Sequence, residues 1–188
     1  SSEEMTKIGK EASEFLTEKV PNPAAKDLKM LEKWNLTVDV LSSQNGWVSV
    51  NAVNNTGFSD VQMREFLALK KQMVWLKLGD TKITDVSLNT IGELTNLTRL
   101  NIENTAVGDA SLQNLEKLKH LQYLNLVGTN VTDKGLAVLK NLKTLKRVYL
   151  WQSNVTLTGI EMLRTSLPDC EVNFGEELIT SIPPNVSK

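Results

Sequence analysis

Several chemically useful residue types are scarce in this 188-residue chain. One cysteine and one histidine leave no internal disulfide bond and no histidine–cysteine cluster for a metal. The 21 Lys and Arg residues against 22 Asp and Glu give a net charge of −1, which argues against the basic footprint of a nucleic-acid-binding protein. No apolar run reaches about 18 residues, so we expect no membrane insertion by this segment. A glycine-rich phosphate loop is also absent.

The chain has instead four consecutive 24-residue units with one shared pattern, at residues 74–97, 98–121, 122–145 and 146–169. The third and fifth positions of each unit are aliphatic, which predicts a short strand with one buried face. The tenth position is again aliphatic, and in the first three units Leu or Ile residues spaced by three follow, as one buried stripe of a short helix. An unbroken period of this length indicates a solenoid, because each unit can bury its apolar side only against its neighbours.

Two polar columns follow the predicted strands. The hydroxyl column consists of Thr81, Thr105, Thr129 and Ser153. We expect these hydroxyls to bond backbone groups where the chain turns, and to reach the next unit. The aspartate column consists of Asp60, Asp85, Asp109 and Asp133. A ladder of carboxylates suggests metal binding, but we interpret each Asp as a residue that opens a helix, a position that favours negative charge.

The pattern Leu-x-x-Leu-x-Leu-x-x-Thr-x-Val-Thr-Asp-x-Gly-Leu, clearest at residues 121–136, resembles a bacterial leucine-rich repeat with Thr in place of the usual Asn. The resemblance implies an α/β fold of the ribonuclease-inhibitor-like kind. It would be a leucine-rich repeat solenoid, a right-handed β-α superhelix with a short curved parallel sheet and a helical N-terminal cap.

A narrower resemblance covers roughly residues 30 to 175. The segments 122–129, 148–152 and 171–175 are similar to the repeat tail of certain Bacteroidetes and Planctomycetes membrane proteins that carry cytochrome-c-like domains. This resemblance alone implies an extracytoplasmic location, periplasmic or membrane-attached, and a cytoplasmic location stays open. The chain has no Cys-x-x-Cys-His motif, so we expect it to bind no c-type haem and no other cofactor.

We divide the chain into an N-terminal helical and strand cap (1–47), the repeats (48–175) and a C-terminal tail (176–188). The repeat region begins with a degenerate unit, in which Asn51 falls at a leucine position, and ends with a closing strand. That closing strand is predicted from Cys170, Val172 and Phe174.

Within the N-terminal cap, residues 3–20 predict one amphipathic helix that ends before Pro21. A second short helix and two strands, at residues 36–41 and 47–53, are expected to follow. Residues 1–20 have two open interpretations: they dock on the first repeat, or they tether the chain to an upstream domain.

The outward-facing strand positions predict where a partner would bind, because they line the inner curve of the sheet. The predicted partner-binding residues are Trp75, Lys77, Arg99, Tyr123, Asn125, Arg147, Tyr149 and Trp151. Aromatic and Arg side chains dominate binding hot spots, and strands about 4.8 Å apart place the last aromatic residues and Arg147 in one patch. The alternative is that these side chains only cover the sheet, or pack beneath the cap or the tail.

The sequence therefore predicts a non-enzymatic recognition module that binds a protein partner or an upstream domain of the same polypeptide. One alternative is a carbohydrate-binding surface, in which Trp75, Tyr123, Tyr149 and Trp151 stack on sugar rings. Another is a structural spacer or cap of a larger membrane-anchored redox protein. His120 is expected in an exposed turn, with no second His and no cluster of metal ligands. Cys170 is expected in the packed interior, with no partner base. We therefore predict no catalytic residue and no metal ligand.

Overall fold

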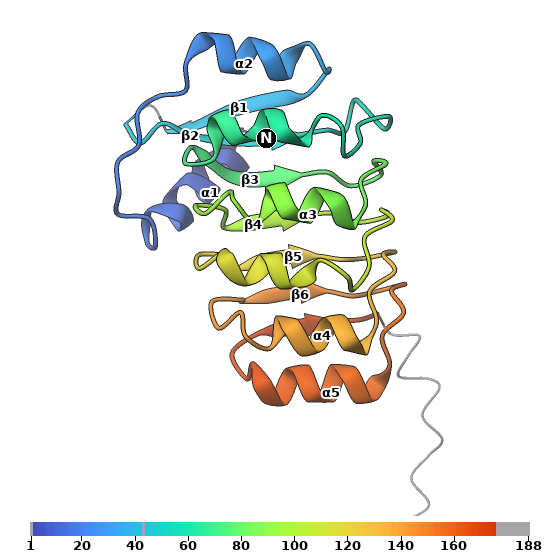
Figure 1. Cartoon of the computed structure of the whole chain (residues 1–188). Coiled ribbons are helices and arrows are strands. Elements are labelled where there is room, and N and C mark those ends of the chain that lie inside the picture. Colours follow the sequence, from blue (N-terminus) through green and yellow to red (C-terminus); the bar gives the residue numbers. More distant parts are fainter. Residues whose placement is uncertain (1, 43, 176–188) are drawn as a thin grey trace, which may run out of the picture.

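The computed structural model describes residues 2–42 and 44–175, so the predicted tail at 176–188 lies outside the described residues. The described chain forms one seven-stranded sheet in sequence order (Figure 1). The strands are β1 (Thr37–Ser42), β2 (Trp47–Asn51), β3 (Met73–Lys77), β4 (Arg99–Asn101), β5 (Tyr123–Asn125), β6 (Arg147–Tyr149) and β7 (Glu171–Asn173). β1 and β2 form an antiparallel hairpin, and every later pair is parallel. This arrangement confirms the predicted leucine-rich repeat solenoid and its closing strand.

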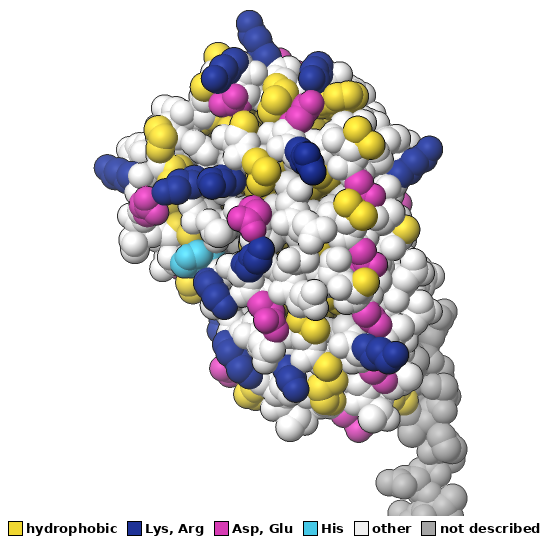
Figure 2. All heavy atoms as spheres, viewed as in Figure 1, with side chains coloured by type: hydrophobic (Ala, Val, Ile, Leu, Met, Phe, Trp, Pro, Cys, Tyr) yellow, Lys and Arg dark blue, Asp and Glu magenta, His cyan; other side chains and the backbone are white. Residues whose placement is uncertain are grey.

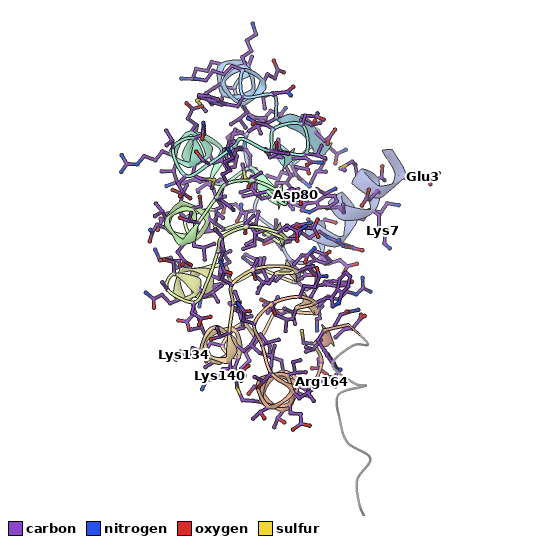
Figure 3. The ribbon with its side chains drawn as sticks, turned by 90° about the vertical axis from the view of Figure 1, so that its right-hand side faces the viewer. Glu3, Lys7, Asp80, Lys134, Lys140 and Arg164 are labelled. Carbon is purple, nitrogen blue, oxygen red and sulfur yellow. The ribbon has the colours of Figure 1, made fainter. Side chains whose placement is uncertain are left out.

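Short helices connect the parallel strands and cover one face of the sheet (Figure 3). They are η1 (Met63–Leu69), α3 (Asp85–Ile91), η2 (Leu112–Lys117), α4 (Asp133–Leu139) and α5 (Leu157–Ser166). α3, α4 and α5 each begin after a Thr whose side chain accepts a backbone N–H. η1 and η2 have no such cap and are 3-10 helices. The presence of the threonine cap therefore separates the α-helical connections from the tighter ones.

The core is one continuous column of mostly aliphatic side chains between the sheet and these helices, with Phe58, Phe66 and Phe174 towards its ends. Parallel pairing places Leu76, Leu100, Leu124 and Val148 in register, and all four are fully buried. In the degenerate first unit, Val50 pairs with Leu76 and takes the inward position. The assignment of Asn51 to a leucine position is therefore wrong, because the register shift at the start of β2 moves the pattern by one residue.

The hydroxyl column closes the turn after each strand. Thr81, Thr105, Thr129 and Ser153 each donate to the carbonyl oxygen three residues earlier, at 2.6 to 2.7 Å. This confirms the predicted bonds to the turn backbone. The expected bonds to the next unit are not formed by these four hydroxyls among the described residues, because each hydroxyl is directed back to its own turn.

The aspartate column holds consecutive units together. Asp109 accepts the Thr132 backbone N–H at 2.9 Å and its hydroxyl at 2.6 Å, and Asp133 accepts the same two groups of Thr156. Asp85 and Asp133 also begin α3 and α4, but in those helices the preceding Thr is the cap. At Asp109 the prediction was wrong, because η2 begins only at Leu112. Each carboxylate thus orients the residues that begin the next connection.

The N-terminal segment contains two helices, α1 (Ser2–Ser13) and α2 (Ala25–Glu32). α2 lies at the end of the stack, where Leu31 is fully buried in the core column (Figure 1). α1 is shorter than the predicted helix over residues 3–20, because the chain turns after Ser13 and brings Leu16 and Val20 against Trp47. α1 lies on the side of the sheet opposite the connecting helices, as the labels on Glu3 and Lys7 show (Figure 3).

The helical face carries charges of both signs without a large area of one sign (Figure 2). No helix within residues 2–42 and 44–175 is long and apolar enough to cross a membrane.

Candidate functional site

α1 divides the inner face of the sheet into two parts. We call the part formed by Trp47, Ser49 and Trp75 of β2 and β3 the covered half. We call the part formed by Tyr123, Arg147, Tyr149 and Trp151, on and just after β5 and β6, the open half. Register pairing places Ser49 beside Trp75 on β2 and β3, and places Tyr123 beside Arg147 on β5 and β6, three strand pairs further along the sheet. The eight predicted binding residues are therefore distributed over two different environments.

Trp75 belongs to the covered half and is only 5% exposed. Its ring is not available to a partner while α1 is in place, so the expectation that Trp75 is an exposed anchor is not met in this structure. Lys77 is half-buried, with its ammonium nitrogen 3.6 Å from the centre of the Trp75 ring. Burial lowers the pKa of Lys77, and the negative charges of Glu4 and Asp39 oppose that shift.

Arg99 joins the two halves. Its guanidinium carbon lies 5.8 Å from the Trp75 ring centre and 5.6 Å from the Tyr123 ring centre. The same guanidinium forms an ion pair with Glu11 of α1. Because a cation between two aromatic faces is attracted to both, Arg99 is held in one position by three neighbours.

The two tyrosines form the centre of the open half. The ring centres of Tyr123 and Tyr149 are 5.3 Å apart and the rings are tilted by 43°. Burial raises the pKa of Tyr123, with further contributions from Tyr149 and Glu103, so the Tyr123 phenol stays neutral at physiological pH. Asn125 is buried, donates to Glu103 at 2.6 Å and accepts the Val127 N–H at 3.0 Å. Asn125 therefore stabilises the turn and is not available as a contact residue.

Arg147 and Trp151 are the most accessible of the predicted residues. Arg147 is exposed and pairs with Glu171 at 3.0 Å. Trp151 is 42% exposed, and its indole lies against the backbone of Gly175. A Cβ atom at Gly175 would collide with that ring, and its positive φ of 79° also favours glycine. The end of the described chain therefore fixes one side of Trp151 and leaves the other side open.

A hollow of about 350 Å³ lies beside the open half, where strands β4 to β7 begin. Its charged and aromatic lining includes Glu11, Arg99, Tyr123, Lys146, Arg147 and Glu171. A second hollow of about 380 Å³, at the other ends of β2 to β4, includes Glu4, Trp75, Lys77, Asn101 and Glu103. Both hollows include Tyr123 and residues of α1, so the covering helix shapes each of them.

Two residues that line the first hollow, Lys146 and Glu11, were not among the predicted binding residues. Lys146 occupies the first position of its unit, and only the second, fourth and sixth positions were considered. That first column changes from Val74 to Thr98, Gln122 and Lys146 along the chain, and this polarity was the available signal. Glu11 had no comparable signal, because its contact with Arg99 joins residues that are 88 positions apart.

Comparisons with known proteins give only partial similarities. No protein-family model and no curated protein matches this chain. A leucine-rich repeat protein of Leptospira interrogans is 26% identical over 57% of this chain and 27% of its own, with a TM-score of 0.48. An internalin of Listeria monocytogenes is 24% identical over 57% of this chain and 30% of its own, with a TM-score of 0.47.

The leucine-rich repeat ectodomain of a receptor kinase from Arabidopsis thaliana is 14% identical over 82% of this chain and 94% of its own, with a TM-score of 0.46. The chain spans less than a third of the length of the two bacterial structures.

Proposed function

We propose that this chain is a non-enzymatic recognition module that binds a protein partner through the open half of its inner sheet face. The observation that carries the proposal is the exposure of Trp151 and Arg147 beside the tyrosine pair and next to a hollow of about 350 Å³. Tyr, Trp and Arg are the residue types that contribute most to protein–protein binding energy. Their grouping on neighbouring strands supplies several anchors within one small area.

The repeat structure supports recognition because it holds these side chains in fixed positions. Tyr123, Arg147 and Glu171 are register partners on three consecutive strands. Consecutive units are also joined by hydrogen bonds to the aspartate column, such as that from the Thr132 N–H to the Asp109 carboxylate. A face that is already ordered loses little conformational entropy when a partner binds, which favours affinity.

The size of the face favours an accessory role. Six parallel strands with spacings of about 4.8 Å give a face roughly 24 Å wide, and α1 covers part of it. We therefore propose that the partner is a neighbouring domain of the same polypeptide or a protein that assembles with it. A membrane-attached redox protein is the context that the sequence resemblance implies, and it stays a part of this proposal.

Carbohydrate binding is less well supported by the geometry. Trp75 is buried, and the tilt between Tyr123 and Tyr149 does not present one flat platform to a sugar ring. We therefore propose protein recognition in preference to carbohydrate binding.

The test is affinity capture from lysate and envelope extract of the source organism, with three baits. They are the wild-type chain, a Tyr149→Ala/Trp151→Ser variant and a Lys134→Ala/Lys140→Ala control. Lys134 and Lys140 are exposed on and beside α4, on the opposite side of the molecule (Figure 3). Circular dichroism of each bait establishes that it is folded.

We expect a protein that is retained by the wild type and by the control and is lost with the Tyr149→Ala/Trp151→Ser bait. Equal retention by all three baits would assign binding to another face. Loss of folding in the aromatic variant would show that Tyr149 and Trp151 are packing residues. If the folded wild-type bait retains no protein, the protein-partner proposal fails.

A further inference from the structure

The covered half contains hydrogen-bonding groups that α1 does not satisfy. The indole nitrogens of Trp47 and Trp75 and the hydroxyl of Ser49 are buried without a hydrogen-bond partner among the described residues. The three residues are between 1% and 5% exposed, and all lie on β2 or β3 on the side of α1. Buried polar groups without partners are uncommon in native proteins, and each one destabilises the arrangement that buries it.

A helix is a poor partner for these donors. The carbonyl groups of α1 are used within the helix, except in its last turn, so the backbone of α1 has few acceptors to offer a donor on the sheet. What α1 offers instead is a small apolar side formed by Ile8 and Ala12, which Leu16 and Val20 extend beyond the helix. The covered half thus combines an apolar contact with three unsatisfied donors.

The contact between α1 and the sheet is also separate from the core of the solenoid. Ala12, Leu16 and Val20 pack with Trp47 and Val74 in a small cluster of their own, apart from the continuous aliphatic column. The opposite side of α1, with Lys7 and Lys10, is exposed. Removing α1 from the sheet would therefore leave the core column intact.

Two of the contacts between α1 and the sheet are specific to the residues involved. Glu11 pairs with Arg99, which lies between the covered half and the open half. Gly9 lies so close to β1 that a Cβ atom at this position would be 3.1 Å from the Leu41 carbonyl oxygen. Glycine destabilises the interior of a helix. Its presence at this position is explained by the close contact with β1, which a side chain would obstruct.

We propose that α1 is a displaceable cover, and that the sheet face beneath it is a second binding surface for an extended peptide segment with unpaired backbone carbonyls. Such a segment brings the acceptors that the Trp47, Ser49 and Trp75 donors lack. Displacement breaks the Glu11–Arg99 pair and joins the covered half to the open half as one face. The proposal rests on the proposed recognition function, and its first test needs no partner.

The test uses a reversible lock on α1 in the full chain. A Cβ atom at Gly9 would lie 3.8 Å from the Cβ atom of Leu41, which is the separation found in disulfide bonds. A Gly9→Cys/Leu41→Cys variant should therefore form a disulfide that holds α1 down when oxidised and releases it when reduced. Cys170 does not compete for the bond, because burial raises its pKa to about 11. The single Gly9→Cys variant is the control for the close contact at this position.

The readout is hydrogen exchange at the indole N–H groups of Trp47 and Trp75, observed by nuclear magnetic resonance with labelled tryptophan. We expect exchange at both groups to be at least tenfold faster in the reduced than in the oxidised variant. In the wild type and the reduced variant, exchange at the two indole groups should also be faster than exchange at core amides such as that of Leu124. The Trp34 indole donates to Glu65 at 2.6 Å, so its exchange should not respond to the lock. If the two indoles and the core amides exchange at equal rates in every form, the proposal that α1 is displaceable is refuted.

The occupant is tested with a phage-displayed library of linear peptides, panned against the oxidised and reduced variants. Peptides enriched only by the reduced form, and weakened at least tenfold by Trp75→Phe, would support an extended segment on the covered half. Equal enrichment by both forms, or no enrichment by either, would refute that occupant. These outcomes are separate from those at Tyr149 and Trp151, so the cover can fail while the recognition function stands, and the reverse.

Discussion

Replacing Asp60 with asparagine tests whether the aspartate column stabilises the solenoid by joining consecutive units. Asp60 belongs to the degenerate first unit and accepts the Thr84 N–H at 2.9 Å and the Thr84 hydroxyl at 2.8 Å. It also accepts the hydroxyl of Ser87. Thr84 in turn caps α3 through the Val86 N–H. One carboxylate therefore fixes both the position of the next unit and the start of its helix.

The expected loss follows from the change in the type of hydrogen bond. A bond to a charged acceptor contributes about 1.5–3 kcal/mol and a bond between neutral groups about 1 kcal/mol. Asparagine keeps one acceptor oxygen, which can still bond the Thr84 N–H and the Ser87 hydroxyl. Its amide nitrogen then faces the Thr84 hydroxyl. We therefore expect Asp60→Asn to lower the free energy of unfolding by about 2 kcal/mol, which lowers the melting temperature by roughly 4–8 °C in a chain of this size.

The effect should depend on pH in one direction. Burial alone would raise the pKa of Asp60, but the hydrogen bonds from Ser87 and Thr84 outweigh it, and the pKa lies below its ordinary value. A carboxyl with a lowered folded-state pKa stabilises the protein above its unfolded-state pKa. That stabilisation is lost as the pH falls through the folded-state pKa. The difference between wild type and Asp60→Asn should be full at pH 7 and should shrink below about pH 4.

Thermal unfolding followed by circular dichroism at pH 7 and at pH 3.5 measures both quantities. Glu161→Gln is the matched control, because it removes one exposed carboxylate on α5 whose side chain makes no hydrogen bond or ion pair among the described residues. We expect the control to change the melting temperature by less than about 2 °C, as exposed sites change stability by under about 0.5 kcal/mol. A loss in Asp60→Asn no larger than in the control, or one that grows as the pH falls, would refute this role of Asp60.

Three further predictions concern the same packing. Gly135→Ala should destabilise by about 1–3 kcal/mol in urea titration despite its better helix propensity, because the new Cβ would lie 2.5 Å from the Asp109 carboxylate. Gly57→Ala should cost less, because the one atom near its new Cβ is the Asn55 Oδ1 atom, at 3.3 Å. Thr129→Val should cost about 1 kcal/mol by losing its bond to the Leu126 carbonyl, and Thr129→Ser should retain that bond; equal losses in both would contradict this role. Because burial raises the Cys170 pKa to about 11, its thiol should react with a disulfide reagent at pH 8 roughly a hundredfold more slowly in the native than in the unfolded chain, and equal rates would show that it is exposed.

The repeat could be predicted from the sequence because every unit solves the same packing problem. Leu76, Leu100 and Leu124 recur at one spacing, and a shared inward position is the arrangement that buries all of them. The irregular first unit was harder to place. Its register depends on the bulge between Val48 and Ser49, which repetition cannot reveal in a unit that does not repeat.

The role of the aspartate column could be identified only from the structure, because two different roles favour an aspartate at the same position. A carboxylate near a helix start can interact with its own helix or bond the next unit, and both leave Asp in that column. Only the distances distinguish them, as the bonds from Thr132 to Asp109 show. The sequence signal that was available is the small residue in the next unit, such as Gly135, which leaves room for the Asp109 carboxylate.

In the four regular units the sequence was sufficient to predict the solenoid, its core residues and the outward-facing strand positions, because these follow from local periodicity. The tertiary structure alone decided which of those side chains are accessible. An amphipathic pattern in residues 3–20 requires burial of one side, but it does not say against which surface. The answer depends on contacts between distant residues, such as Glu11 with Arg99 and Leu16 with Trp47, and these contacts bury Trp75 and leave Trp151 open.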